Sequence, residues 1–148
     1  MSQTTFNVGR DVTVVAISAT GARLDLTGLT KFSVKNNVAK VTSAPLNTVP
    51  LMRALPEGHD ISFDIDRKSA ANDALFSQIE QGYWAGGYPN GTTGGGTLWV
   101  YITETDGSTS TFQGTGVVLW AEQEVEASQK EALKQTIGGF ASTYQKVG

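Results

Sequence analysis

The stretch HDISFDID, from His59 to Asp66, alternates polar and apolar residues. Successive side chains of a β-strand point to opposite faces of its sheet, so Ile61, Phe63 and Ile65 share one face. The opposite face carries Asp60, Ser62, Asp64 and Asp66. The stretch therefore predicts a strand with one buried apolar face and one face that carries a row of acids.

One short helix follows this strand in the sequence. Ser69 or Asn72 can cap a helix that runs to about Gln81, and Gly82 is a stop signal. Its buried stripe is apolar and consists of Leu75, Phe76 and Ile79. We expect a single small helix beside a sheet.

A glycine-rich loop and a long hairpin come next. Residues 86–96 contain repeated glycines and predict a flexible connection. Asp106-Gly107 supplies turn chemistry between strands predicted at 97–103 and 110–125. Gly114 and Gly116 indicate a bulge, or a close approach by another backbone, within the second strand.

The flanking segments also have β-character. Strands are predicted at residues 11–17 and 29–35, with a short piece at 22–26 and a break at Asn36-Asn37. The C-terminal segment predicts a turn of helix or irregular structure over residues 127–135, followed by a closing strand at 137–141. The fold class expected is mainly β, a β-sandwich or open barrel with one short flanking α-helix.

Residues 36–58 read as an extended arm or loop, with at most a short edge strand at residues 38–41. Three prolines interrupt the stretch, and each removes a backbone donor. A structureless segment of this length needs a binding role, so we expect it to contact a neighbouring subunit. The residues predicted to form this inter-subunit arm are Val38, Val41, Leu46, Val49, Leu51, Met52 and Arg53.

Length and composition favour one domain spanning residues 1–148. Only 17% of the residues are charged and 17 are glycine, a balance that favours strands and tight turns over a helical bundle. The absence of cysteine excludes disulfides, zinc–thiolate sites and thiol nucleophiles.

A net charge of −3 and a pI near 5.0 argue against stable nucleic-acid binding, which normally needs a basic patch. The first residues show neither a cationic start nor an apolar run, and no window approaches the roughly 20 apolar residues of a membrane span. We therefore expect no membrane partner and a protein made in the cytoplasm.

The acids could suggest a metal site or a hydrolase, but strand geometry weakens both readings. Asp60 and Asp64 would lie about 13 Å apart, too far to share one ion, whereas Asp64 and Asp66 would lie roughly 6.6 Å apart. A carboxylate pair at that distance can act in hydrolysis, but no flanking apolar pocket is apparent. His59 is the only histidine. We predict a charged surface at Asp60, Asp64 and Asp66, with no catalytic residue, metal or cofactor.

A carbohydrate-binding β-sandwich is an alternative from another class. Aromatic side chains can stack on sugars, and the chain offers Tyr83, Tyr88, Tyr101, Trp84, Trp99 and Trp120. Core or subunit-interface positions are the commoner explanation for such residues. Loss of glycan binding in Trp84→Ala would favour the alternative.

Three stretches together resemble the tail tube proteins of tailed bacteriophages. They are DISFDIDR at 60–67, TLWVYITETDGSTSTFQGTGVVL at 97–119 and EASQKEALKQTIGGFAS at 126–142. The resemblance extends from about residue 11 to residue 144 and is one of strand and turn pattern. The tube protein of type VI secretion systems shares this architecture.

The resemblance implies a structural virion protein of the tail, without enzymatic activity. Its expected role is a tube subunit that assembles into stacked, hexameric rings forming a conduit for DNA ejection. It implies self-association and contacts with tape measure, baseplate, terminator and sheath proteins, with DNA only in transit. A tail terminator, a baseplate ring or another minor tail protein is the alternative within the virion. Assembly is expected in the host bacterial cytoplasm, and the acids Asp60, Asp64 and Asp66 would face the lumen or solvent.

Overall fold

The computed structural model describes residues 6–19, 21–85 and 95–148. A short 3-10 turn at Gly9–Asp11 precedes the strands. The described elements are β1 Val12–Ile17, β2 Leu29–Ser43, β3 Leu51–Asp66, α1 Ala71–Trp84, β4 Gly96–Thr103, β5 Thr109–Glu126, β6 Lys134–Ala141 and β7 Thr143–Lys146. The expected mainly β fold with one flanking helix is confirmed.

All strand pairs are antiparallel, and the order across the sheet is β1-β4-β5-β6-β3-β2, with β7 also paired to β5. The first half of β5 pairs with β4 and β7, and its second half pairs with β6. The predicted bulge lies between these halves at Gly116, whose φ is +63°. The sheet stays open, and β5 connects its two parts.

One core joins both parts of the sheet. Val14 and Ala16 of β1 belong to the same buried cluster as Ile61, Phe63 and Ile65 of β3. The Phe63 side chain is completely buried, and its ring centroid lies 5.2 Å from that of Phe32. The alternation of HDISFDID therefore assigned the buried face correctly.

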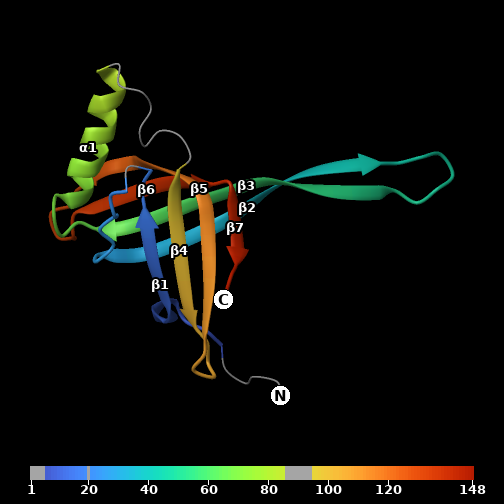
Figure 1. Ribbon diagram of the computed structural model, residues 1–148, viewed down its shortest axis with the longest axis horizontal. Helices are drawn as coiled ribbons and strands as arrows, with labels where there is room; N and C mark the ends of the chain where they lie inside the picture. The colour runs from blue at the N-terminus through green and yellow to red at the C-terminus, as the bar shows by residue number, and fades with distance from the viewer. Residues whose placement is uncertain (1–5, 20, 86–94) are drawn as a thin grey trace.

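Residues 36–58 form a hairpin, which corrects the expected loop. β2 continues through Asn36-Asn37, and its pairing with β3 extends from Leu29 opposite Ile65 to Ser43 opposite Leu51. Figure 1 shows the distal part of this hairpin projecting far beyond the rest of the sheet. Pro45 begins the turn, where the N–H of Thr48 donates to its carbonyl, and Pro56 lies opposite Val38 beside a bulge. Proline is tolerated at both places, so it did not break the strands.

Several boundaries also differ from expectation. α1 passes Gly82 and ends at Trp84, since a glycine in open space does not itself terminate a helix. Its N-cap is Ala70, which has no side-chain cap, rather than the expected Ser69 or Asn72. Asn72 lies inside the helix and bonds Asp25, and Ser69 accepts from the N–H of Ala71 at 3.4 Å. The piece at 22–26 is reduced to one bridge between Ile17 and Arg23. β6 confirms the closing strand expected at 137–141 but begins earlier, at Lys134, within the stretch 127–135 that was expected to be irregular. Most of the glycine loop lies outside the described residues.

Replacing Gly28 with alanine will destabilise the fold by about 1–3 kcal/mol. A Cβ at this position would lie 2.0 Å from the carbonyl oxygen of Asp66, and backbone cannot move aside as a side chain can. Urea unfolding measures the loss. Gly82→Ala is the matched control, because open space surrounds Gly82 within α1, and a gain of up to about 1 kcal/mol is expected there. Equal stability of the two variants would contradict the prediction.

Candidate assembly surface

The distal part of the β2–β3 hairpin, residues 38–56, forms an arm. Its large apolar side chains are uncovered: Leu46 is 90% exposed, Val49 77%, Met52 65% and Leu51 63%. Val38, Val41 and Leu55 are exposed as well. The chain's own core does not bury these side chains. Burying them against a partner surface would therefore be favourable.

Apolar side chains lie on both faces of the arm. Residues opposite each other in register share a face, so Met52 shares one with Thr42, and Leu51 shares the other with Ser43. Val41 lies opposite Arg53 on the same face as Leu51. All seven residues predicted for an inter-subunit arm therefore fall on this hairpin, and a partner has to cover two sides of it to bury them.

A bulge marks the base of the arm. Register shifts between Asn36, opposite His59, and Val38, opposite Pro56, so β3 carries one extra residue there. Gly58 within it has a φ of +93°, and a Cβ would lie 2.2 Å from the Phe140 ring. Because bulges bend a strand and increase its twist, β3 bends where the arm leaves the body.

The acid row of β3 lies within a mixed-charge face. Asp60 is opposite Lys35, Asp64 is opposite Lys31, and Asp66 is opposite Lys134. Thr136 also donates to the Asp64 carboxylate at 3.3 Å. Each predicted acid therefore has a lysine across from it, so this face is less acidic than β3 alone suggests. The sequence alone does not reveal these lysines, because they lie on partner strands whose register with β3 depends on the fold.

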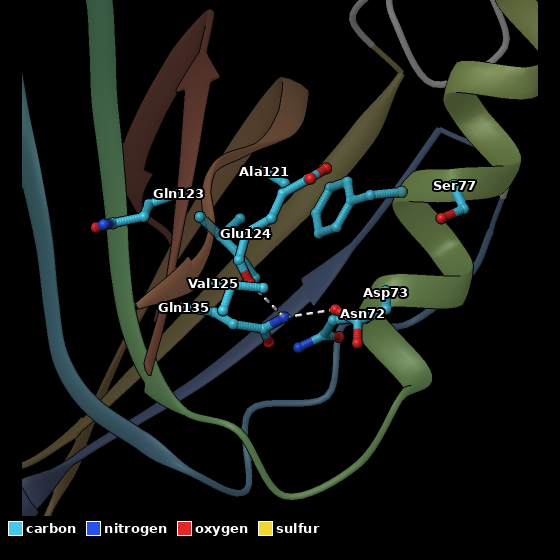
Figure 2. A pocket seen from close by; sticks show the side chains of 10 residues that line it. Asn72, Asp73, Ser77, Ala121, Gln123, Glu124, Val125 and Gln135 are labelled. Carbon is cyan, nitrogen blue, oxygen red and sulfur yellow. Dashed lines mark hydrogen bonds between the residues drawn. The ribbon is translucent and has the colours of Figure 1, made fainter. Parts of the chain in front are cut away.

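The N-terminal end of α1 is fixed to the sheet by a polar network. The amide of Gln135 donates to the Asp73 carboxylate and, at 3.2 Å, to the Glu124 carbonyl oxygen, as Figure 2 shows. Asp73 also pairs with Arg67 at 2.8 Å. Since these residues come from α1, β5, β6 and the end of β3, the network fixes the helix relative to three strands.

Asn72 anchors the same helix end to the segment before β2. Its side chain accepts from the N–H of Asp25 and donates to the carbonyl oxygen of Asp25, each at 2.8 Å. The Ser69 hydroxyl donates to the Asp25 carboxylate, and with Thr27 it holds the pKa of that carboxyl below its usual value. A pKa lowered by folding means that this contact stabilises the fold above the unfolded pKa and is lost as pH falls through the folded one.

Replacing Asn72 with alanine will lower the free energy of unfolding by roughly 1–3 kcal/mol. Asn72 is buried, and without its side chain the N–H and carbonyl groups of Asp25 have lost the partner that they bond in the folded protein. Thermal or urea unfolding measures the loss of stability. Asn7→Ala is the control, since exposed Asn7 also bonds a backbone carbonyl, that of Thr103, and a change within about 0.5 kcal/mol is expected. A cost for Asn72→Ala no larger than for Asn7→Ala would refute the anchoring role.

A groove between α1 and β5 was not anticipated from the sequence. It has a volume of about 530 Å³ and is lined by Phe76, Ile79, Glu80, Tyr83, Val118, Leu119, Trp120, Ala121 and Glu124. Of its lining residues, Tyr83 is 53% exposed. The signal available was Tyr83-Trp84 at the helix end, two large aromatics beyond the predicted stop.

His59 and the tryptophans, which belong to the metal and sugar-binding alternatives, lie on separate elements. His59 contacts Tyr144 with ring centroids 5.6 Å apart. Trp84 packs edge-on against Tyr83, whereas Trp99 and Trp120 come from β4 and β5. Across residues 6–19, 21–85 and 95–148, no group of three acidic or histidine side chains is placed to hold a metal ion. Within the same ranges, no helix has the length and apolar character needed to cross a membrane.

The open antiparallel sheet, the one α-helix among the described residues and the projecting hairpin define a phage tail tube-like fold. A chain of the anti-feeding prophage baseplate superposes with a TM-score of 0.63 at 12% identity, covering 99% of this chain and 98% of that one. The SPP1 tail tube gives 0.62 at 16% identity, covering 96% and 79%. The cap that terminates the anti-feeding prophage tube gives 0.60 at 11% identity, covering 99% and 95%.

No protein-family model matches the chain, and no curated protein matches its sequence. At identities of 11–16%, the structural likeness establishes the fold alone. The arm is the feature of this chain that most directly bears on its role.

Proposed function

We propose that this protein is a tail tube subunit of a virion. Its copies assemble into hexameric rings, and the stacked rings form a conduit for DNA ejection. The main support for this role is the arm, a two-stranded projection with exposed apolar residues on both faces. A lone arm of this kind exposes apolar surface that folding leaves uncovered, and copies of the chain would cover it. The proposed role is structural and non-enzymatic.

Free sheet edges support ring closure. Among the described strands, β2 pairs on one side only, with β3, and the second half of β5 pairs only with β6. Pairing β2 of one copy with β5 of the next would cover these two edges, which otherwise promote disordered aggregation, and would leave the edge of β1. Each ring would then be lined by a continuous sheet built from several chains.

The mixed-charge face fits the lumen of that ring. The opposite face of β3 carries the core, so the face with Asp60, Asp64 and Asp66 is the one available to a channel. Lysines opposite these acids offset much of their charge, and Glu122 and Glu126 of β5 leave the face mildly acidic. A wall that neither attracts nor strongly repels phosphates would let DNA pass without holding it.

Sedimentation of the purified protein over a range of concentrations tests this role. We expect the monomer to give way to rings or longer polymers as the concentration rises. A monomer that persists at every concentration, and that is absent from the tail of its particle, would contradict it.

A ring at one end of the tube is the second candidate, favoured by the likeness to chains of a baseplate and of a tube-terminating cap. Copy number separates the two, because a tube subunit is present in many rings and an end ring in one. Quantitative mass spectrometry of the particle, scaled to a protein of known copy number, would show tens of copies or more for a tube subunit. About six copies would favour the end ring. Partners of either role would include baseplate, tape measure, terminator or sheath proteins.

A further inference from the structure

The groove between α1 and β5 is an apolar surface with an acidic border. Phe76, Ile79 and Val118 line it, and Glu80 and Glu124 lie at its sides. Neither Ala71–Trp84 nor Thr109–Glu126 contains a lysine or arginine. An apolar segment that carries positive charge would complement it.

The arm has that character. Between residues 37 and 56 the charged residues are Lys40 and Arg53, and no acid is present. Its tip also presents Leu46 and Val49, the two most exposed large apolar side chains of the arm. Both apolar character and charge therefore match between arm and groove.

The arm and the groove lie at opposite ends of the molecule. Figure 1 shows the arm extending to one end of the long axis, with α1 at the other. A chain therefore cannot place its own arm in its own groove. A contact between two different surfaces of the same chain is heterologous, and it repeats from copy to copy.

We infer that the arm tip of one copy docks in the α1–β5 groove of another. This inference rests on the proposed function and specifies which surface receives the arm. Leu46 and Val49 enter beside Tyr83, while Arg53 lies near Glu80 and Glu124. The arm thereby links successive copies beyond the contacts made by sheet edges.

Charge reversal tests the match. Arg53→Glu, and separately the pair Glu80→Lys with Glu124→Lys, should each raise the concentration needed for assembly by about fivefold. Combining all three should restore assembly toward that of the unaltered chain. Lys130→Glu, at an exposed position outside both surfaces, is the matched control and should have no effect. Equal loss in the control, or no restoration in the triple variant, would overturn the inference.

Crosslinking tests the contact itself, because the chain has no cysteine. Copies with cysteine at Leu46, Val49 or Leu51 are mixed with copies that carry Tyr83→Cys, assembled and oxidised. A disulfide-linked pair is expected from at least one combination and from none in which Lys130→Cys replaces Tyr83→Cys. Unfolding midpoints close to that of the parent chain verify that the variants fold.

The outcomes separate the inference from the role it rests on. Tubes that form without any arm–groove disulfide would overturn the docking contact and leave the tube role intact. Failure of the parent chain to assemble, together with its absence from the tail of its particle, would overturn the role and the docking contact together.

Discussion

A variant in which Asn-Gly replaces residues 37–58 will fold normally and will not form tubes. Asn36 and His59 are opposite each other in register, so a two-residue turn can join them without disturbing the rest of β2 and β3. The variant loses the exposed arm and keeps the whole buried cluster. We expect an unfolding midpoint close to that of the parent chain and a monomer by sedimentation at every concentration tested.

A smaller change should act in the same direction. Met52→Asp with Leu51→Asp places a charge on each apolar face of the arm, and burying such charges in an interface is costly. We expect assembly to be lost at concentrations where the parent chain assembles fully. Thr105→Asp adds one charge at an exposed position in the β4–β5 turn and serves as control. Normal tubes from the arm replacement or from the double variant would contradict the role of the arm.

Truncating Phe63 to alanine will remove about 3–5 kcal/mol from the free energy of unfolding. The side chain is fully buried in β3, packs against Phe32, and lies between the two parts of the open sheet. A loss of that size is a large fraction of the roughly 5–15 kcal/mol typical of a domain. Urea unfolding at two wavelengths measures it.

Phe63→Leu is the matched control, because it keeps most of the buried volume, and we expect it to cost clearly less than the alanine variant. Val49→Ala, on the arm, should change the free energy of unfolding by no more than about 0.5 kcal/mol. A loss below about 1 kcal/mol for Phe63→Ala would contradict the placement of Phe63 at the centre of the core.

The parts of the fold with a buried face could be predicted from the sequence. Ile61, Phe63 and Ile65 alternate because one face of β3 packs on the core. Asp106-Gly107 predicts the turn between β4 and β5, because glycine favours the positive φ that Gly107 adopts there, +91°. In both places local chemistry and tertiary packing favour the same structure.

The arm could not be recognised as a hairpin by the same reasoning. Its strands have no core to face, so Val38, Val41, Leu51 and Met52 show no alternation of burial. Asn47, with a φ of +65°, and the preceding Pro45 were the usable turn signals. They lie between two stretches of similar length that pair with each other.

The arm residues could be predicted from the sequence, whereas the lysines beside the acid row and the α1–β5 groove could not. Every predicted arm residue falls on one projection, since apolar residues near prolines can be recognised in the sequence alone. The lysines opposite the acid row and the α1–β5 groove depend on which strands are neighbours. That information comes from non-local pairing, which a periodicity cannot supply.

The most direct test of the tube role is cryo-electron microscopy of the assembled protein with helical reconstruction, in polymers of the purified chain or in tails of its particle. We predict stacked rings of this chain around an open channel, with β2 and β5 of adjacent copies side by side and the face of Asp60, Asp64 and Asp66 toward the channel. A tail whose rings contain another protein, together with a purified chain that stays monomeric, would contradict it.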